Sequence, residues 1–129
     1  MKKIKWYVLC FFMLCMVACG NGNVGNNYDY MVKVVNNTSV DIYGIGYYFY
    51  INGNVVNSGG ACNADNSVIK NGEAFFLEQI SDGEAFSVEF SVADKNGKEY
   101  FCPTKMEIKR GEQYTIQIVG DFEKGFEIK

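Results

Sequence analysis

The sequence predicts an all-β domain, an antiparallel β-sandwich of about seven to eight strands that follows an N-terminal signal peptide. Three observations support this prediction. Apolar and polar residues alternate over short stretches, and turn signals recur about every ten residues. The 129 residues also include nine Tyr and ten Phe but only one Pro. Aromatic side chains favour pleated, half-buried surfaces, so this composition suits strands.

The first 18 residues are organised as an export signal. Three lysines within residues 1–5 precede an uncharged apolar run over residues 6–18. The run is shorter than the roughly 20 residues that span a bilayer. The segment Met16-Val17-Ala18-Cys19 then resembles a lipobox, the motif of bacterial lipoprotein precursors, although Leu is commoner than Met at its first position. The resemblance implies that Cys19 is diacylated and becomes the mature N-terminus. An ordinary secretory signal or an uncleaved anchor is the alternative.

Cleavage before Cys19 would make the chain more acidic. It removes three of the 12 basic residues and none of the 15 acidic ones, so the net charge falls from −3 to −6. An acidic domain does not suit nucleic acid or anionic lipid headgroups. We therefore predict no nucleic-acid partner, and membrane attachment through the lipid alone. The protein would lie outside the cytoplasmic membrane, either on the extracytoplasmic face of the cell membrane or on the periplasmic side of an outer membrane.

The remaining chain divides into a tether and one domain. Residues 19–27 form the predicted tether, because three Gly and four Asn within it favour flexible backbone. Residues 28–129 form the predicted sandwich domain. Its two cysteines, Cys62 and Cys102, are an even pair in an exported chain, which predicts a disulfide worth roughly 4 kcal/mol. Two free thiols or a metal site are the alternatives. Two thiolates without any histidine fall short of a zinc ligand set, so no metal is predicted.

Alternation predicts the first two strands and the hairpin after them. One strand carries four inward residues and ends at the polar segment 36–38; they are Tyr28, Tyr30, Val32 and Val34. A long second strand covers residues 39–51, with one apolar face made of Tyr43, Ile45, Tyr47, Phe49 and Ile51. Its other face carries Gly44, Gly46, Tyr48 and Tyr50, so the two glycines would leave room for a ligand to approach the tyrosines. A change of phase at Val40 and Ile42 predicts a bulge or bend near Gly44–Gly46. Asn52-Gly53 predicts a tight return into Val55-Val56.

The clearest strand covers residues 84–92, with Phe86, Val88, Phe90 and Val92 pointing inward. The charged residues after this strand decide between two possible turns into the next strand. A two-residue turn would oppose Lys95 to Lys98, a like-charge pair, whereas a three-residue turn opposes Asp94 to Lys98. The second turn also pairs Val92 with Tyr100 and Phe90 with Cys102. We therefore predict the three-residue turn, with Gly97 in the left-handed conformation and Cys102 in the core.

The C-terminal third predicts two more strands. One has Tyr114, Ile116 and Ile118 inward, and the last carries Phe122, Phe126 and Ile128; residues 75–80 are ambiguous between strand and helix. In size, strand spacing and its cysteine pair, the domain resembles immunoglobulin-like or transthyretin-like domains. The resemblance implies an architecture and carries no function with it.

The composition favours binding over catalysis. The absence of histidine excludes Ser-His-Asp and Cys-His catalysis, and no carboxylate pair is marked as facing one cleft. We predict a non-enzymatic, lipid-anchored binding or accessory module without a cofactor. The alternatives are a structural or inhibitory lipoprotein that acts on an envelope enzyme through loop contacts, and a small carboxylate-dependent hydrolase. Tyr48 and Tyr50 are the candidate ligand-binding residues, for a glycan, a peptide or an envelope protein, unless another segment covers them.

Overall fold

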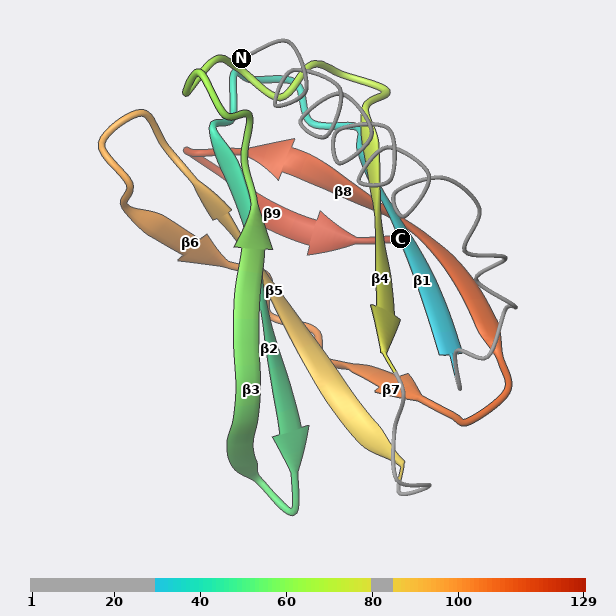
Figure 1. The fold of residues 1–129 in the computed structure, drawn as a ribbon. Coiled ribbons are helices and arrows are strands. Elements are labelled where there is room, and N and C mark those ends of the chain that lie inside the picture. Colours follow the sequence, from blue (N-terminus) through green and yellow to red (C-terminus); the bar gives the residue numbers. More distant parts are fainter. Residues whose placement is uncertain (1–29, 80–84) are drawn as a thin grey trace, which may run out of the picture.

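A computed structural model describes residues 30–79 and 85–129, which form nine β-strands and no helix (Figure 1). The strands are β1 (Tyr30–Asn36), β2 (Gly44–Ile51), β3 (Asn54–Ala61), β4 (Ala74–Gln79), β5 (Phe86–Ala93), β6 (Glu99–Phe101), β7 (Met106–Ile108), β8 (Gln113–Asp121) and β9 (Gly125–Ile128). No part of the described chain is a helix long and apolar enough to cross a membrane. Cys19, the tether, Tyr28 and Glu84 lie outside the described residues.

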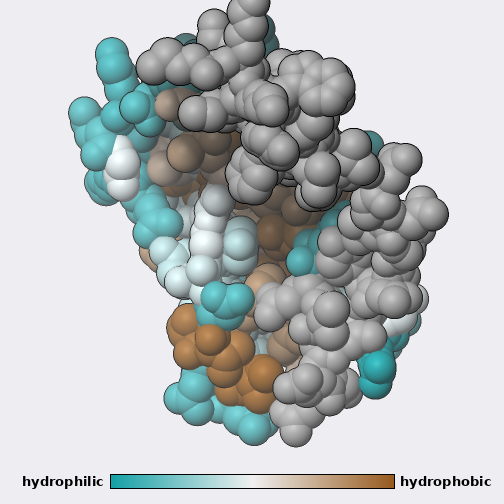
Figure 2. Space-filling model, viewed as in Figure 1, coloured by the Kyte–Doolittle hydropathy of each residue, from teal (hydrophilic) through white to brown (hydrophobic). Residues whose placement is uncertain are grey.

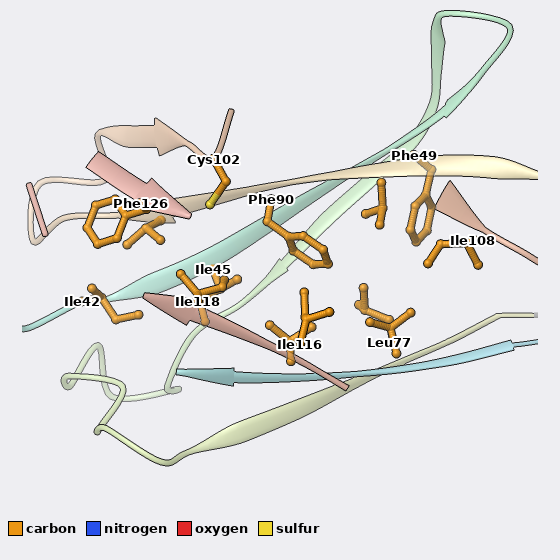
Figure 3. Close-up of a cluster of buried hydrophobic side chains, with 14 of the residues drawn as sticks. Ile42, Ile45, Phe49, Leu77, Phe90, Cys102, Ile108, Ile116, Ile118 and Phe126 are labelled. Carbon is orange, nitrogen blue, oxygen red and sulfur yellow. The ribbon is translucent and has the colours of Figure 1, made fainter. Parts of the chain in front are cut away.

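The strands form two sheets with one core between them. The four-stranded sheet has the order β4-β1-β8-β9, and the five-stranded sheet has the order β3-β2-β5-β6, with β7 beside β5. β6 and β7 pair with different parts of β5, which is why the strand count exceeds the predicted seven to eight. Buried side chains from both sheets meet in a single cluster, as Figure 3 shows for Ile116 and Leu77 on one side and Phe90 on the other.

One strand pair corrects the prediction of a purely antiparallel fold. β1 runs antiparallel to β4 but parallel to β8, with Val32 beside Tyr114 and Val34 beside Ile116. These partners lie 82 positions apart in the sequence. Parallel neighbours need a long connection, and here the chain between them builds the whole five-stranded sheet.

The alternating patterns confirm which side chains enter the core. In β1, Tyr30, Val32 and Val34 are buried, and in β5 the same holds for all four residues that were predicted to point inward. Ile116 and Ile118 of β8 are buried as well, as is Phe126 of β9. The ambiguous segment 75–80 belongs to strand β4 as far as Gln79.

Both predicted turns are confirmed. Asn52 and Gly53 have φ of 50° and 79° and join Ile51 to Asn54, so they make the two-residue turn between β2 and β3. In the hairpin between β5 and β6, Val92 pairs with Tyr100.

The second hairpin has the three-residue turn that the charges favoured. The Asp94 amide donates to the Lys98 carbonyl at 3.0 Å, and Gly97 has φ of 79°. Asp94 Oδ1 accepts from the Asn96 and Lys98 amides at 2.8 and 3.0 Å, so this one side chain holds the turn together. The Cys102 amide donates to the Phe90 carbonyl at 2.8 Å, and Cys102 is buried as the register required.

The long second strand differs from its prediction. β2 begins at Gly44, and Ile42 forms only an isolated bridge with Ile69 before it. The register shift lies between Phe49 and Tyr50 against β3, and not near Gly44–Gly46. The extra residue in that pairing is on β3, where Val56 has no β2 partner. The predicted change of phase does occur just before β2, because Ile42 and Ile45 are both buried although they lie three positions apart.

The predicted disulfide is absent, which is a correction. Cys62 is an exposed free thiol and Cys102 a buried one. Cys62 follows β3 and Cys102 follows β6, and these strands lie at opposite edges of the five-stranded sheet. Three strand spacings separate them, about 14 Å. A disulfide needs Cα atoms within about 7 Å, so the fold itself keeps the two thiols apart.

Candidate functional site

Three aromatic side chains lie together on the outer face of the five-stranded sheet, the face turned away from the four-stranded sheet. Tyr48 and Tyr50 come from β2 and Phe101 comes from β6; we call these three residues the aromatic strip. The Tyr48 and Phe101 ring centroids are 5.4 Å apart. Both tyrosines are partly exposed, and half of the Phe101 side chain is accessible to solvent. No described segment of the chain covers the strip completely.

Two carboxylates fix the tyrosine hydroxyls. The Tyr48 hydroxyl lies 2.9 and 2.8 Å from the two carboxylate oxygens of Glu99, and the Tyr50 hydroxyl donates to Glu89 Oε2 at 2.6 Å. Glu89 is the cross-strand partner of Tyr48 on β5, so its side chain reaches diagonally to Tyr50. The rings are therefore held in place by groups that remain open to solvent on one side.

Gly46 provides the space that Glu99 occupies. A Cβ at Gly46 would lie 2.4 Å from Ser91 Oγ and 2.9 Å from Glu99 Oε1. The Ser91 hydroxyl donates to the same Glu99 oxygen at 2.9 Å, and Ser91 is buried by this arrangement. The sequence had suggested that Gly46 leaves room for a ligand near the tyrosines. The room is instead filled by a side chain of β6.

A lysine already lies on one ring of the strip. Lys105, from the segment between β6 and β7, places its Nζ 3.5 Å from the centroid of the Tyr50 ring. A cation over a tyrosine face is attracted by the negative potential of the ring. The nearby carboxylate of Glu89 adds to that attraction, so the strip accepts a positive charge from within the chain itself.

The electrostatics of the strip follow from these contacts. The hydrogen bond to Glu99 raises the pKa of Tyr48 above its ordinary value, with smaller effects of desolvation and of the charges on Glu99 and Glu89. The pKa of Tyr50 is raised by its hydrogen bond to Glu89 in the same way. Both tyrosines therefore stay protonated at neutral pH and act as hydrogen-bond donors. Neither is prepared to act as a base or a nucleophile.

The other hollows in the described part of the chain contain fewer groups that could bind a ligand or react. One of about 550 Å³ lies at the end of the five-stranded sheet, between Tyr43, Cys62 and the turn after β5. The Asp94 carboxylate there already accepts two backbone hydrogen bonds. No group of three or more Cys, Asp or Glu that could hold a metal ion occurs in residues 30–79 and 85–129. Hydrogen bonds within turns lower the pKa of Asp65 and of Asp121.

The strip unites residues that the sequence singled out with residues that it did not. Tyr48 and Tyr50 share the outer face as predicted. Cys102 follows Phe101 directly but is buried in the core, and Cys62 is exposed after the end of β3. The sequence did not predict that Phe101 belongs to the strip, or that Glu89 and Lys105 contact Tyr50. The β5–β6 register could have placed Phe101 outward, because it puts Tyr100 and Cys102 inward, but nothing in the sequence shows that β2 lies next to β5.

Comparisons with family models, with curated proteins and with solved structures give no match to this chain.

Proposed function

We propose that this protein is a lipid-anchored binding module of the bacterial cell envelope and that it binds a positively charged segment of a peptide or envelope protein through the aromatic strip. The observation that carries the proposal is the set of contacts around Tyr50: a lysine ammonium on its face and a carboxylate on its hydroxyl. A partner's Lys or Arg side chain would take the place of Lys105. The mature net charge of −6 would attract such a partner over a longer range.

A non-enzymatic role suits the arrangement of the carboxylates. Glu89 and Glu99 each accept a hydrogen bond from a tyrosine hydroxyl, whereas a carboxylate-dependent hydrolase places its acid and base across one cleft from each other. The fold we propose for the domain is an immunoglobulin-like or transthyretin-like sandwich. Its two sheets of four and five strands with a shared core support that assignment.

The anchor rests on the sequence alone. Cys19 would carry the lipid, and the flexible tether would span a root-mean-square distance of about 15 Å between the lipid and the domain. Replacing Cys19 with Ala should leave the precursor uncleaved and prevent incorporation of labelled palmitate. Recovery of a mature chain that begins at another residue would contradict the anchor and leave the binding proposal intact.

The binding proposal is tested with the full chain and three probes: a lysine-rich peptide, its counterpart with Gln in place of Lys, and a neutral oligosaccharide. The double variant Tyr48→Ser, Tyr50→Ser should lose binding of the lysine-rich peptide and keep its unfolding midpoint. Phe76→Ser is the matched control, because Phe76 is an aromatic residue on the other sheet with 54% of its side chain exposed.

Lys105→Ala sharpens the test. It removes the internal competitor, so the affinity for the lysine-rich peptide should rise, and added salt should weaken binding. Preference for the neutral oligosaccharide would overturn the cationic ligand class. Equal binding by the double variant and the wild type would overturn the strip as the site.

A further inference from the structure

Two turns of the chain, residues 69–73 and 108–112, have nearly the same sequence and the same conformation. They read Ile-Lys-Asn-Gly-Glu and Ile-Lys-Arg-Gly-Glu and lie 39 positions apart. In each turn the glycine has a positive φ, 87° at Gly72 and 79° at Gly111, and the amide of the Glu donates to the carbonyl of the Lys, at 3.0 and 3.3 Å. The Ile that opens each turn is buried. The two turns are therefore equivalent in sequence, backbone and burial.

Each turn also has the same place relative to a hairpin. Ile69 forms a bridge with Ile42, just before the β2–β3 hairpin. Ile108 pairs with Phe86, at the start of the β5–β6 hairpin. The chain thus follows one course twice: a buried residue, a hairpin, an Ile beside that first residue, and a turn into the four-stranded sheet.

The strands that follow the two turns are related by a two-fold axis. β4 and β8 lie on either side of β1 and run in opposite directions. Ala74, which begins β4, faces Val35 of β1, and Gln113, which begins β8, faces Met31. Val35 and Met31 are equally far from Lys33, the middle residue of β1. Rotation about Lys33 therefore carries Ala74 onto Gln113, with the same 39-residue offset as the turns.

The five-stranded sheet has the same symmetry. In its order β3-β2-β5-β6, the two hairpins meet along the antiparallel pair of β2 and β5. The ladder between these strands has seven residue pairs and is centred on Tyr47 and Phe90. Rotation about that centre exchanges β2 with β5 and β3 with β6. Each hairpin turn contains a glycine with φ of 79°, Gly53 in one and Gly97 in the other.

We propose that the domain consists of two copies of one β-unit, residues 42–79 and 86–118, related by a two-fold axis through Lys33 and the pair of Tyr47 and Phe90. β1 lies on the axis and is shared by both copies. A repeat of this size cannot bury its apolar face alone, so the two copies cover each other. Inward positions correspond as apolar pairs. These pairs are Ile45 with Val88, Tyr47 with Phe90, Phe49 with Val92, Phe75 with Tyr114, and Leu77 with Ile116.

The two copies differ on the outer face of the five-stranded sheet. Hydrophobic surface covers the start of β3, where Val55 and Val56 are 52% and 56% exposed (Figure 2). Val55 faces Tyr50 of β2, and the corresponding residue of the second copy is Glu99, which faces Ala93 of β5. One copy thus presents an apolar side chain where the other presents a carboxylate.

The aromatic strip has no counterpart under the rotation. Tyr48 and Tyr50 correspond to Ser91 and Ala93, which lie 43 positions later, as Phe90 does from Tyr47. The unit therefore forms with small residues at these positions. On the proposed binding function, on which this step rests, the rings serve the ligand and not the fold.

The third ring of the strip fits the same rule. Phe101 faces Ser91 of β5, as Ser58 faces Tyr48 of β2, so Phe101 corresponds to Ser58. The strip is thus made of aromatic residues that the other copy replaces with Ser or Ala. Phe101 is thereby assigned to binding together with the two tyrosines.

The repeat is tested by replacing residues 69–79 of the full chain with the sequence of residues 108–118. This transplant should keep a single cooperative urea transition with a midpoint close to that of the wild type, because the turn keeps its glycine and every inward position receives an apolar residue. The control inserts the sequence of residues 106–116 at the same place. It moves the glycine out of the turn and puts a glutamate at the inward position of Phe75, so it should unfold at a lower urea concentration. A transplant that loses as much stability as this control would overturn the repeat.

Phe101→Ser tests the assignment of the third ring. The unfolding midpoint should change little, and the affinity for the lysine-rich peptide should fall about tenfold. Phe76→Ser, at a similarly exposed aromatic residue on the other sheet, is the control and should leave the affinity unchanged. A Phe101 variant that unfolds early, or that keeps full affinity, would overturn the assignment. A wild-type chain that does not bind the peptide would overturn the proposed binding function and the role of the rings, whereas the transplant judges the repeat without any ligand.

Discussion

The two edges of the five-stranded sheet are built in opposite ways. At one edge, β3 is continuous, uncharged and exposed on both faces. At the other, β6 and β7 are three residues each, interrupted around Pro103, and each carries a glutamate. Yet this broken edge supplies Cys102 and Ile108 to the core, both almost completely buried. Stability therefore depends on the edge that is protected from other chains, and the edge open to them contributes little to the core.

The largest expected effect comes from truncating one side chain at each edge. Ile108→Ala in β7 should cost about 2–5 kcal/mol of unfolding free energy, because it leaves a cavity in the core. Val56→Ala in β3 should stay within about 0.5 kcal/mol, since its side chain is already exposed. Urea unfolding with a common slope measures both. Equal losses would show that the two edges contribute alike.

A smaller effect separates two positions in the turn that begins the β6 edge. Gly97→Val should cost about 1–3 kcal/mol, because a β-branched residue is strained at φ of 79°. Lys95→Val lies in the same turn at an ordinary φ and should change stability by less than about 0.5 kcal/mol. Thermal unfolding of the two variants measures this difference in stability. A Lys95 variant as unstable as the Gly97 variant would mean that the turn has another geometry.

The two cysteines differ in burial, and the buried one makes the stability of the domain depend on pH. Burial, with smaller effects of Glu89 and Glu127, raises the pKa of Cys102 from 9.0 to about 11. The protonated thiol is thus favoured in the folded state, and its contribution to stability is complete below pH 9 and lost as pH rises from 9 to about 11. Stability should decline over this window, and less steeply in Cys102→Ala.

Tyr30 titrates over a window that begins one pH unit higher and overlaps that of Cys102, and it provides the internal reference because both proteins contain it. Its pKa is raised to about 12, chiefly by burial and also by Tyr47, so its contribution is lost between pH 10 and about 12 in both proteins. Thiol labelling at neutral pH gives a second measurement: Cys62 should react in the native state and Cys102 only after unfolding. Rapid native labelling of Cys102 would contradict its burial.

The smallest expected effect is at the polar face of β6. Glu99→Gln weakens an exposed hydrogen bond to Tyr48 and a part-buried one to Ser91, and it should cost less than about 1 kcal/mol because Gln can still accept from both hydroxyls. The informative measurement is an NMR titration, in which the pKa of Tyr48 should fall back toward its ordinary value because its largest cause has been removed. Glu127→Gln, on the other sheet, should leave that pKa unchanged.

Local chemistry explains what could be predicted from the sequence. The turn at Asp94–Lys98 was predictable because like charges disfavour one register and a glycine permits the other, and all of this lies within five residues. The inward faces of β1 and β5 were predictable because alternation is a property of each strand alone. Tyr48 and Tyr50 were assigned to the outer face by the same argument.

Long-range pairing explains what could not be predicted. The parallel contact of Val32 with Tyr114 leaves no trace in either segment. An even number of cysteines in an exported chain favours a disulfide. It does not show that Cys62 follows β3 and Cys102 follows β6, which are strands at opposite edges of one sheet. Likewise, Gly46 was predicted to leave an open space, and only the order of β2, β5 and β6 shows that Glu99 fills it.

The parallel pairing of β1 with β8 has a consequence for the order in which the chain can fold. A chain that leaves the ribosome or a membrane channel from its N-terminus presents β1 first, before β4 and long before β8 exist to pair with it. Hairpins such as β2–β3 and β5–β6 can close early, because their loops are short. The four-stranded sheet closes only after residue 113 has emerged, so the domain remains loose enough to be threaded through a channel until almost its whole length has passed.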